Sequence, residues 1–325
     1  MNGPLDDFRA VLADLPVLDV KAAGQVRESF ERSGETALGR LAEIPAWLAG
    51  VSGRARPITR PTVAVFAGTH GIARHGISIE PADATRKLVD RAASGAGAVN
   101  QVCTAYELGL KFYDLALDVP TRDFTSDAAL DERAAAATIA FGMEAVGGGI
   151  DLAALGTAGV GGRTAAGAIA AALHGGAGAD WIDSAAPAHI VRRQIEVIDA
   201  GLAFHAGQLD DPLEVLPRFG GREFLAVAGA IVAARMERIP VILDGFAACA
   251  AAAALHRATP AALDHCMLAQ AGIEPGHRKL IEKLGLSPLL DLGVADGQGT
   301  AAALAAGLVK TAAQVHAGLA ATLVR

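Results

Sequence analysis

Residues 156–164 form the strongest candidate in the sequence for an anion-binding site. The segment reads GTAGVGGRT, follows a short apolar run, and is expected to lead into a helix that begins near Arg163. Glycines let the backbone approach a ligand closely, and N–H groups at a helix start attract phosphate. No Gly-Lys-Ser/Thr follows, so the segment is not a Walker loop. The residues assigned here to a phosphate or nucleotide site are Thr157, Gly159, Gly161, Gly162, Arg163 and Thr164.

Several ionisable side chains follow other apolar runs and could transfer protons. Asp244 comes directly after one such run, Glu274 shortly after another, and Asp296 after the last. His70 follows the first run and could act as an acid or base, or as a hydrogen-bonded loop residue. The chain has 38 glycines, so the glycine-rich segments could equally be tight packing turns. Both interpretations stay open on the residues alone.

The elements that must position these residues are predicted from short apolar runs that alternate with alanine-rich helical stretches. Near-continuous apolar runs are typical of strands covered on both faces, and strand–helix alternation predicts a parallel sheet. Ligands bind beyond the carboxyl ends of such strands, where the candidate residues fall. The six predicted strands are Thr62–Ala67, Leu110–Leu117, Leu152–Leu155, Pro240–Leu243, Leu263–Leu268 and Leu289–Leu292.

Both ends of the chain are predicted to be helical. Residues 4–49 are interpreted as two helices, and residues 51–57 as a polar connection that could separate two domains. Residues 299–325 form one long alanine-rich helical pattern without a strand, expected to pack against the N-terminal helices.

Composition narrows the class of protein. The chain has 325 residues, 52% hydrophobic residues and a net charge of −7, which argues against a nucleic-acid groove. Its longest apolar stretches are well short of the ~20 residues of a membrane span, so no membrane association is expected. No signal-peptide pattern opens the sequence, and three scattered cysteines suggest no disulfide frame. We therefore expect a cytoplasmic protein.

Six segments, in this order along the chain, resemble the nicotinate-nucleotide:dimethylbenzimidazole phosphoribosyltransferases, enzymes of cobalamin lower-ligand synthesis. Together they are specific, and the likeness runs from about residue 61 to residue 319. The first resembles the family's F-A-x-D-H-G and G-V-S, and the second its G-G-A-A-I-N. The segments are FAGTHG at 66–71 with GIS at 76–78, SGAGAVN at 94–100, DPLEVL at 211–216, LDGF at 243–246, EPGH at 274–277 and LLDLG at 289–293.

The resemblance implies a fold and a reaction. The fold is α/β, a Rossmann-like parallel sheet of about six strands, here residues 57–299, with a small helical domain from residues 1–56 and 300–325. The reaction moves phosphoribose from nicotinate mononucleotide to a benzimidazole nitrogen, giving nicotinate and an α-ribazole phosphate. The expected partners are these small molecules and a second copy of the chain in a homodimer; no metal or cofactor is expected. We expect Ser78, His70 and Asp244 to contact the base.

The sequence departs from the family pattern at positions that matter chemically. The family's general base, a glutamate, is here Gln298, and a second family glutamate is Thr157. In an ungapped alignment the phosphate-site lysine falls on Gln194, and a glycine-rich G-R-G-T-G falls on residues 181–185. The serine before Glu274 is lost, although Gly272 nearby is kept as a phosphate-site candidate.

These departures leave two hypotheses. A carboxamide cannot accept the proton that the acceptor base loses, so Gln298 should slow the reaction by roughly 10²–10⁴-fold unless Asp296 or Glu274 substitutes. Arg163 could replace the lysine as phosphate anchor. The first hypothesis is a diverged phosphoribosyltransferase with these catalytic residues. The alternative is a catalytically impaired homologue that binds a base or nucleotide as a sensor, or acts as the silent subunit of a mixed dimer.

Overall fold

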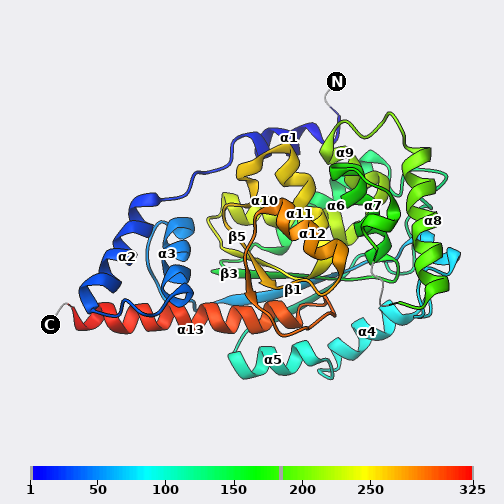
Figure 1. The fold of residues 1–325 in the computed structure, drawn as a ribbon. Helices are drawn as coiled ribbons and strands as arrows, with labels where there is room; N and C mark the ends of the chain where they lie inside the picture. Colours follow the sequence, from blue (N-terminus) through cyan, green and yellow to red (C-terminus); the bar gives the residue numbers. More distant parts are fainter. Residues whose placement is uncertain (1–2, 183–185, 324–325) are drawn as a thin grey trace.

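Six parallel strands form one sheet in the order β2-β1-β3-β4-β5-β6 (Figure 1). The computed structural model describes residues 3–182 and 186–323. The predicted parallel α/β sheet is confirmed, and each predicted strand has a counterpart. The largest shift is at β5, which begins at Cys266 because Pro260–Leu263 form a 3-10 helix. The strands are β1 (Pro61–Ala67), β2 (Gly109–Asp114), β3 (Leu152–Ala158), β4 (Val241–Leu243), β5 (Cys266–Gln270) and β6 (Pro288–Leu290).

Helices cover both faces of the sheet, as the near-continuous apolar strands predict. Successive strand side chains point to opposite faces. Phe66 and Leu155 therefore join one hydrophobic cluster, whereas Val65 and Ala154 join another. The first cluster is closed by α6 (Glu132–Ala145), α7 (Gly162–His174), α10 (Arg222–Met236) and α11 (Gly245–Ala258). The second is closed by α13 (Thr300–Thr322), α5 (Ala98–Tyr106) and α3 (Arg40–Ser52).

Small residues let the helices on the first face pack backbone against backbone. A Cβ added at Gly229 of α10 would lie 2.1 Å from the carbonyl oxygen of Ile139 on α6, and one at Gly142 would lie 2.0 Å from that of Ala226. The alanine-rich α11 is likewise enclosed, with every residue from 248 to 255 fully buried. Alanine suits such helices because it has high helix propensity and little volume.

The N-terminal segment contains three helices rather than the two predicted. They are α1 (Asp6–Ala13), α2 (Val20–Ser33) and α3 (Arg40–Ser52). The chain leaves the helical conformation after α2, because Gly34 adopts a left-handed conformation with φ of +77° and ends the helix. The α1 helix packs on the α/β part, where Phe8 and Leu12 join its main cluster.

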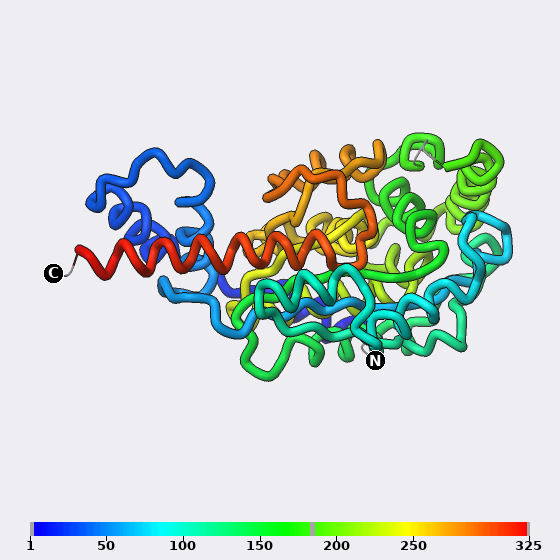
Figure 2. The backbone as a smooth tube through the Cα atoms, turned by 90° about the horizontal axis from the view of Figure 1, so that it is seen from below, coloured from blue at the N-terminus to red at the C-terminus, as the bar shows by residue number. Residues whose placement is uncertain are grey.

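The predicted C-terminal helix is α13, the longest helix described. Its first part lies against the sheet, and its last part packs on α2 and α3 (Figure 2). His316 of α13 and Ser29 of α2 are joined by a buried hydrogen bond of 2.8 Å. A separate small cluster that includes Phe30, with Val315 and Leu319 packed against it, holds this end together. The exact domain bounds at residues 1–56 and 300–325 stay a prediction.

The strand order places a switch point between β1 and β3. The chain passes from β1 to β2 on one side, and then continues on the other side of β1 with β3. Ligands bind in the crevice that such a reversal opens at the carboxyl ends of the strands. No helix in the described ranges is long and apolar enough to cross a membrane. The remaining helices are α4 (Ala84–Ala93), α8 (Ala188–Phe204), α9 (Pro212–Phe219) and α12 (Pro275–Leu284).

Candidate active site

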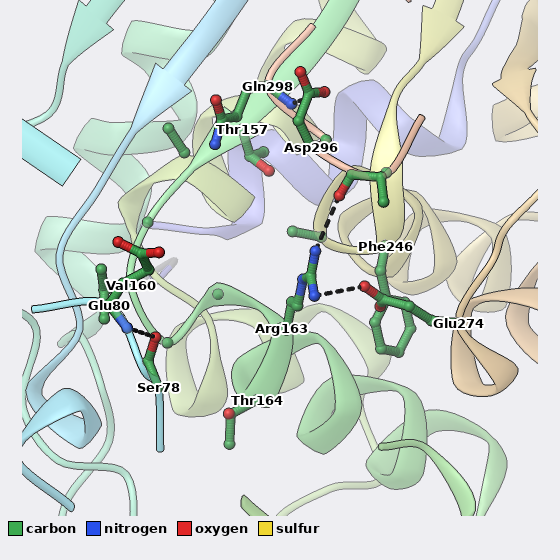
Figure 3. A pocket seen from close by; sticks show the side chains of 18 of the residues that line it. Ser78, Glu80, Thr157, Val160, Arg163, Thr164, Phe246, Glu274, Asp296 and Gln298 are labelled. Carbon is green, nitrogen blue, oxygen red and sulfur yellow. Dashed lines mark hydrogen bonds and ion pairs between the residues drawn. The ribbon is translucent and has the colours of Figure 1, made fainter. Parts of the chain in front are cut away.

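A cavity of about 910 Å³ opens at the carboxyl ends of the strands, where the sheet topology predicts it. Its walls come from the segments that follow β1, β3, β4, β5 and β6 (Figure 3). All predicted site residues except His70 line this cavity. They are Ser78, Thr157, Gly159, Gly161, Gly162, Arg163, Thr164, Gln194, Asp244, Gly272, Glu274, Asp296 and Gln298.

The turn between β3 and α7 brings a helix N-terminus to the cavity. Gly161 adopts a φ of +99°, and a Cβ at Gly159 would lie 2.9 Å from the carbonyl oxygen of Gly68, so both positions favour glycine. The first turn of α7 leaves N–H groups without partners inside the helix. Thr164 lies in this turn with 1% exposure, and its Oγ1 has no hydrogen-bond partner among the described residues. The turn is thus equipped to donate hydrogen bonds to an anion.

Arg163 extends from the same turn into the middle of the cavity (Figure 3). Its Nη1 lies 3.0 Å from Oε1 of Glu274, and its Nη2 donates to the carbonyl oxygen of Ala295 at 3.0 Å. The structure thus brings together two residues that are 111 positions apart in the sequence. The guanidinium expected to anchor phosphate is paired with a carboxylate here.

The loop from β6 to α13 carries Asp296 and Gln298. The N–H of Thr157, on β3, donates to the carbonyl oxygen of Gly297 at 3.0 Å, which holds this loop against the sheet. Oδ1 of Asp296 accepts a hydrogen bond of 3.1 Å from the N–H of Gln298, and Oδ2 bonds the hydroxyl of Thr300. Figure 3 shows Thr157, Asp296 and Gln298 grouped at one end of the cavity.

Asp244 holds the start of α13. Its Oδ2 accepts hydrogen bonds from the N–H groups of Gly299 at 3.1 Å and Ala302 at 3.2 Å. Burial, with the neighbouring charge of Asp296 second, raises the pKa of Asp244 to about 7. The residue lines the cavity, and its hydrogen bonds to α13 give it a positioning role; its contact with the base stays a prediction.

His70 lies behind the β3–α7 turn rather than in the cavity wall. It is 3% exposed, and its Nε2 lies 2.5 Å from Oε1 of Glu223, which does line the cavity. Glu223 is in the first turn of α10 and is 1% exposed. The sequence analysis did not predict Glu223 as a site residue. The only signal in the sequence was an acid placed directly after Gly220, Gly221 and Arg222 at a helix start.

Two predicted binding residues form local hydrogen bonds along the cavity wall. Nε2 of Gln194 donates to the carbonyl oxygen of Ile77 at 3.0 Å, so the amide braces the segment that carries Ser78. Ser78 Oγ accepts a 3.0 Å hydrogen bond from the N–H of Glu80. Residues 183–185, part of the segment aligned with the family's G-R-G-T-G, lie outside the described residues.

A family model described as phosphoribosyltransferase matches residues 16–323 of the chain. The chain belongs to this phosphoribosyltransferase family. It is 53% identical to nicotinate-nucleotide–dimethylbenzimidazole phosphoribosyltransferase of Allorhizobium ampelinum, over 98% of this chain and 94% of that protein. The enzyme of the same name from Rhizobium etli, strain CFN 42, is 51% identical over 98% of this chain and 95% of its own length.

The fold agrees with a solved structure of the same enzyme name. The crystal structure from Thermus thermophilus matches with a TM-score of 0.84 and 31% sequence identity. The match covers 92% of this chain and 96% of that chain. The resemblance drawn from the sequence motifs is therefore confirmed at the level of family and fold.

The phosphoribosyltransferase cavity also contains aromatic residues that the sequence motifs did not predict as site residues. The rings of Phe246 and His277 stack with centroids 5.7 Å apart, and both residues line the cavity. Burial, with the charge of Arg163 second, lowers the pKa of His277 to about 4, so its imidazole is neutral at pH 7. Among the described residues no group of three or more His, Cys, Asp or Glu side chains could hold a metal.

Proposed function

We propose that this protein transfers phosphoribose from nicotinate mononucleotide to a benzimidazole-type base, releasing nicotinate and an α-ribazole phosphate. The observation that carries the proposal is the first turn of α7. It presents N–H groups without intrahelical partners and the unpartnered hydroxyl of Thr164 to a cavity that also holds Asp296, Gln298 and Glu274. Half of the residues are shared with relatives named for this reaction.

The donor phosphate is assigned to the β3–α7 turn. Backbone N–H groups at a helix start and the Thr164 hydroxyl donate hydrogen bonds to its oxygens, and the helix dipole favours its negative charge. Arg163, in the same turn, can add a bidentate contact. This assignment leaves the rest of the cavity, including the end with Thr157 and Gln298, for the two aromatic bases.

Proton transfer in this cavity cannot use a carboxylate at position 298, because that residue is Gln298. As the bond from ribose to nicotinate breaks, its electron pair goes to the pyridine nitrogen, and a bond forms from ribose to the acceptor nitrogen. The acceptor then loses its N–H proton, which Gln298 cannot take. Asp296 precedes Gln298 in the same loop, and Glu274 lies across the cavity; these are the proposed proton acceptors.

Incubation of the purified protein with nicotinate mononucleotide and a panel of benzimidazoles, purines and phenols tests the proposal. Chromatography should show nicotinate release that depends on the acceptor. Thr164→Val should raise the KM for the donor, because valine has nearly the same shape as threonine but lacks the hydroxyl that donates a hydrogen bond. Absence of nicotinate release with every acceptor would contradict the proposed reaction. Calorimetric binding without turnover would instead support the sensor, and a stable mixed dimer the silent subunit.

We also propose that the enzyme is a homodimer that works in the cytoplasm. Ile79 and Leu292, near the cavity, are 72% and 62% exposed, which suits a surface covered by a second copy. The described cysteines Cys103, Cys249 and Cys266 are free and buried, as is usual in a reducing compartment. Sedimentation analysis tests the dimer, and cell fractionation tests the compartment.

A further inference from the structure

The Arg163 side chain links three strand ends across the cavity. It starts on α7, after β3, and pairs with Glu274, which immediately precedes α12 after β5. The same guanidinium donates to the carbonyl oxygen of Ala295, in the loop after β6. Figure 3 shows both interactions meeting at the one side chain. The Arg163 guanidinium therefore contacts both Glu274 and this loop.

The two partners of the ion pair differ strongly in exposure. The Arg163 side chain is 53% exposed, whereas that of Glu274 is 8% exposed. An ion pair with one partner in solvent contributes little to stability. Charge-assisted hydrogen bonds to an anion are stronger, so a phosphate can compete for this guanidinium.

A competing anion site lies in the same helical turn as Arg163. The turn opens onto the cavity after the left-handed Gly161, and the buried Oγ1 of Thr164 has no partner among the described residues. An anion bound to these donors lies next to the base of the Arg163 side chain. The guanidinium can therefore reach either this anion or Glu274.

We propose that Arg163 is a positioning residue that acts as a latch operated by the donor phosphate. Without ligand it is tied to Glu274 and Ala295. When the phosphate binds at the start of α7, the guanidinium turns to it and gives up both contacts. Glu274, no longer paired with Arg163, then takes the N–H proton that the acceptor base loses as the new glycosidic bond forms. The latch rests on the proposed function, because the phosphate is that of the donor.

The latch predicts the direction in which phosphate affinity changes when the charge of Glu274 is removed. Glu274 and the phosphate compete for one guanidinium, so removal of the Glu274 charge must tighten phosphate binding. A purely structural ion pair predicts the reverse, because loss of Glu274 would leave Arg163 less well positioned. The same competition makes the donor bind before the acceptor can be deprotonated.

Calorimetry on the full-length protein, with inorganic phosphate and with nicotinate mononucleotide as probes, measures this sign. Glu274→Gln should lower both dissociation constants by roughly two- to fivefold, the factor that corresponds to the strength of a half-exposed ion pair. Arg163→Met should raise them by about tenfold or more. Arg163→Lys keeps a cation and should fall between, which covers the case that the Met variant misfolds.

Glu80→Gln is the matched control. Glu80 lines the same cavity but is not an ion-pair partner of Arg163 in the structure, so it reports the general effect of removing one negative charge. The tightening must be larger in Glu274→Gln than in Glu80→Gln. The double variant Arg163→Met/Glu274→Gln should bind phosphate like Arg163→Met alone. Unchanged or weaker phosphate binding in Glu274→Gln would overturn the latch.

Binding and turnover separate this inference from the proposed function. In turnover, Glu274→Gln should lower kcat while lowering the KM for the donor, a split that a structural defect would not produce. The expected binding signs without any nicotinate release would support the latch and contradict the proposed reaction. Nicotinate release with unchanged phosphate binding in Glu274→Gln would support the reaction and overturn the latch.

Discussion

A carboxamide at position 298 limits what the cavity can do with a proton. The side-chain oxygens of Asp296, in the same loop, already accept hydrogen bonds from the Gln298 N–H and the Thr300 hydroxyl. Glu223 is paired with His70, and Glu274 with Arg163. Each of these carboxylates thus has a partner, and proton transfer must come from rearranging one of these interactions.

Replacing Gln298 by glutamate tests this limit directly. Because Asp296 or Glu274 is proposed to accept the acceptor proton already, the Gln298→Glu variant should change nicotinate release with a benzimidazole acceptor by much less than the roughly 10²–10⁴-fold that a missing general base would restore. Steady-state assays of nicotinate release measure the change. Gln101→Glu, a substitution at an exposed position on α5, is the control and should leave the rate unchanged. A gain of about 10²–10⁴-fold in Gln298→Glu would mean that neither Asp296 nor Glu274 accepts the proton.

Asp244 should make stability depend on pH. Burial raises its pKa from 3.8 to about 7, so the folded protein holds this proton more tightly than the unfolded chain does. Its contribution to stability is present below pH 4 and is lost as the pH rises through 7. In urea unfolding, Asp244→Asn should therefore gain roughly 1–3 kcal/mol relative to wild type between pH 4.5 and pH 8.

Asp90→Asn, at an exposed position on α4, controls for a general charge effect. The difference in unfolding free energy between this variant and wild type should stay nearly constant over the same pH range. A constant difference for Asp244→Asn as well would show that the carboxyl of Asp244 does not titrate upon burial as the structure indicates.

At the scale of elements, glycines decide how closely the helices on the first sheet face approach. Gly229 of α10 lies against the backbone of Ile139 on α6. This contact anchors α10, whose first turn carries Glu223 at the cavity. This packing between α6 and α10 therefore positions Glu223, although Glu223 lies outside the contact itself.

Substitution of Gly229 by alanine should destabilise the fold. Its Cβ would lie 2.1 Å from the Ile139 carbonyl oxygen, and backbone must move to make room. We expect a loss of about 1–3 kcal/mol in the free energy of unfolding, measured with urea. Gly24→Ala in α2 is the matched control, because no atom lies within 4 Å of its added Cβ. It should be neutral or stabilise by up to about 1 kcal/mol. Equal effects of the two substitutions would contradict this account of the packing.

At the scale of the whole molecule, α13 connects the two hydrophobic regions at its ends. Ala312 and Ala313 belong to the cluster on the sheet, and Val315 and Leu319 contact the cluster of α2 and α3. Because one continuous helix joins them, order in the α2–α3 region depends on the integrity of α13 between these positions.

Gln314→Pro should uncouple the two regions. Proline inside a helix costs about 3 kcal/mol or more and removes a backbone hydrogen bond. Gln314 is exposed, so loss of its side chain should not itself affect stability. Hydrogen exchange should show lost protection in α2 and α3 while the sheet stays protected. Gln314→Ala should show neither effect. Simultaneous loss of protection in β1 and β3 would contradict the separation of the two regions.

Most strands were predictable because they are nearly continuous apolar runs between glycines and polar residues. The N-terminal helices were harder to predict, since the apolar spacing continues past Gly34 while the left-handed backbone ends α2 there. The cavity was predictable in its position, because parallel strands direct their following loops to one edge. The partners within it were not, as the pairing of Arg163 with Glu274 and of His70 with Glu223 shows.

The order of amino acids by itself determined which segments become strands, which loops carry glycine and acid, and which family the chain belongs to. These properties depend on residues that are neighbours along the chain, so local periodicity and motif spacing are enough to reveal them. Tertiary structure alone decided which charges meet in the cavity and which are buried behind it. Such contacts join residues more than a hundred positions apart, and only the packing of helices on both sheet faces brings them within hydrogen-bonding distance.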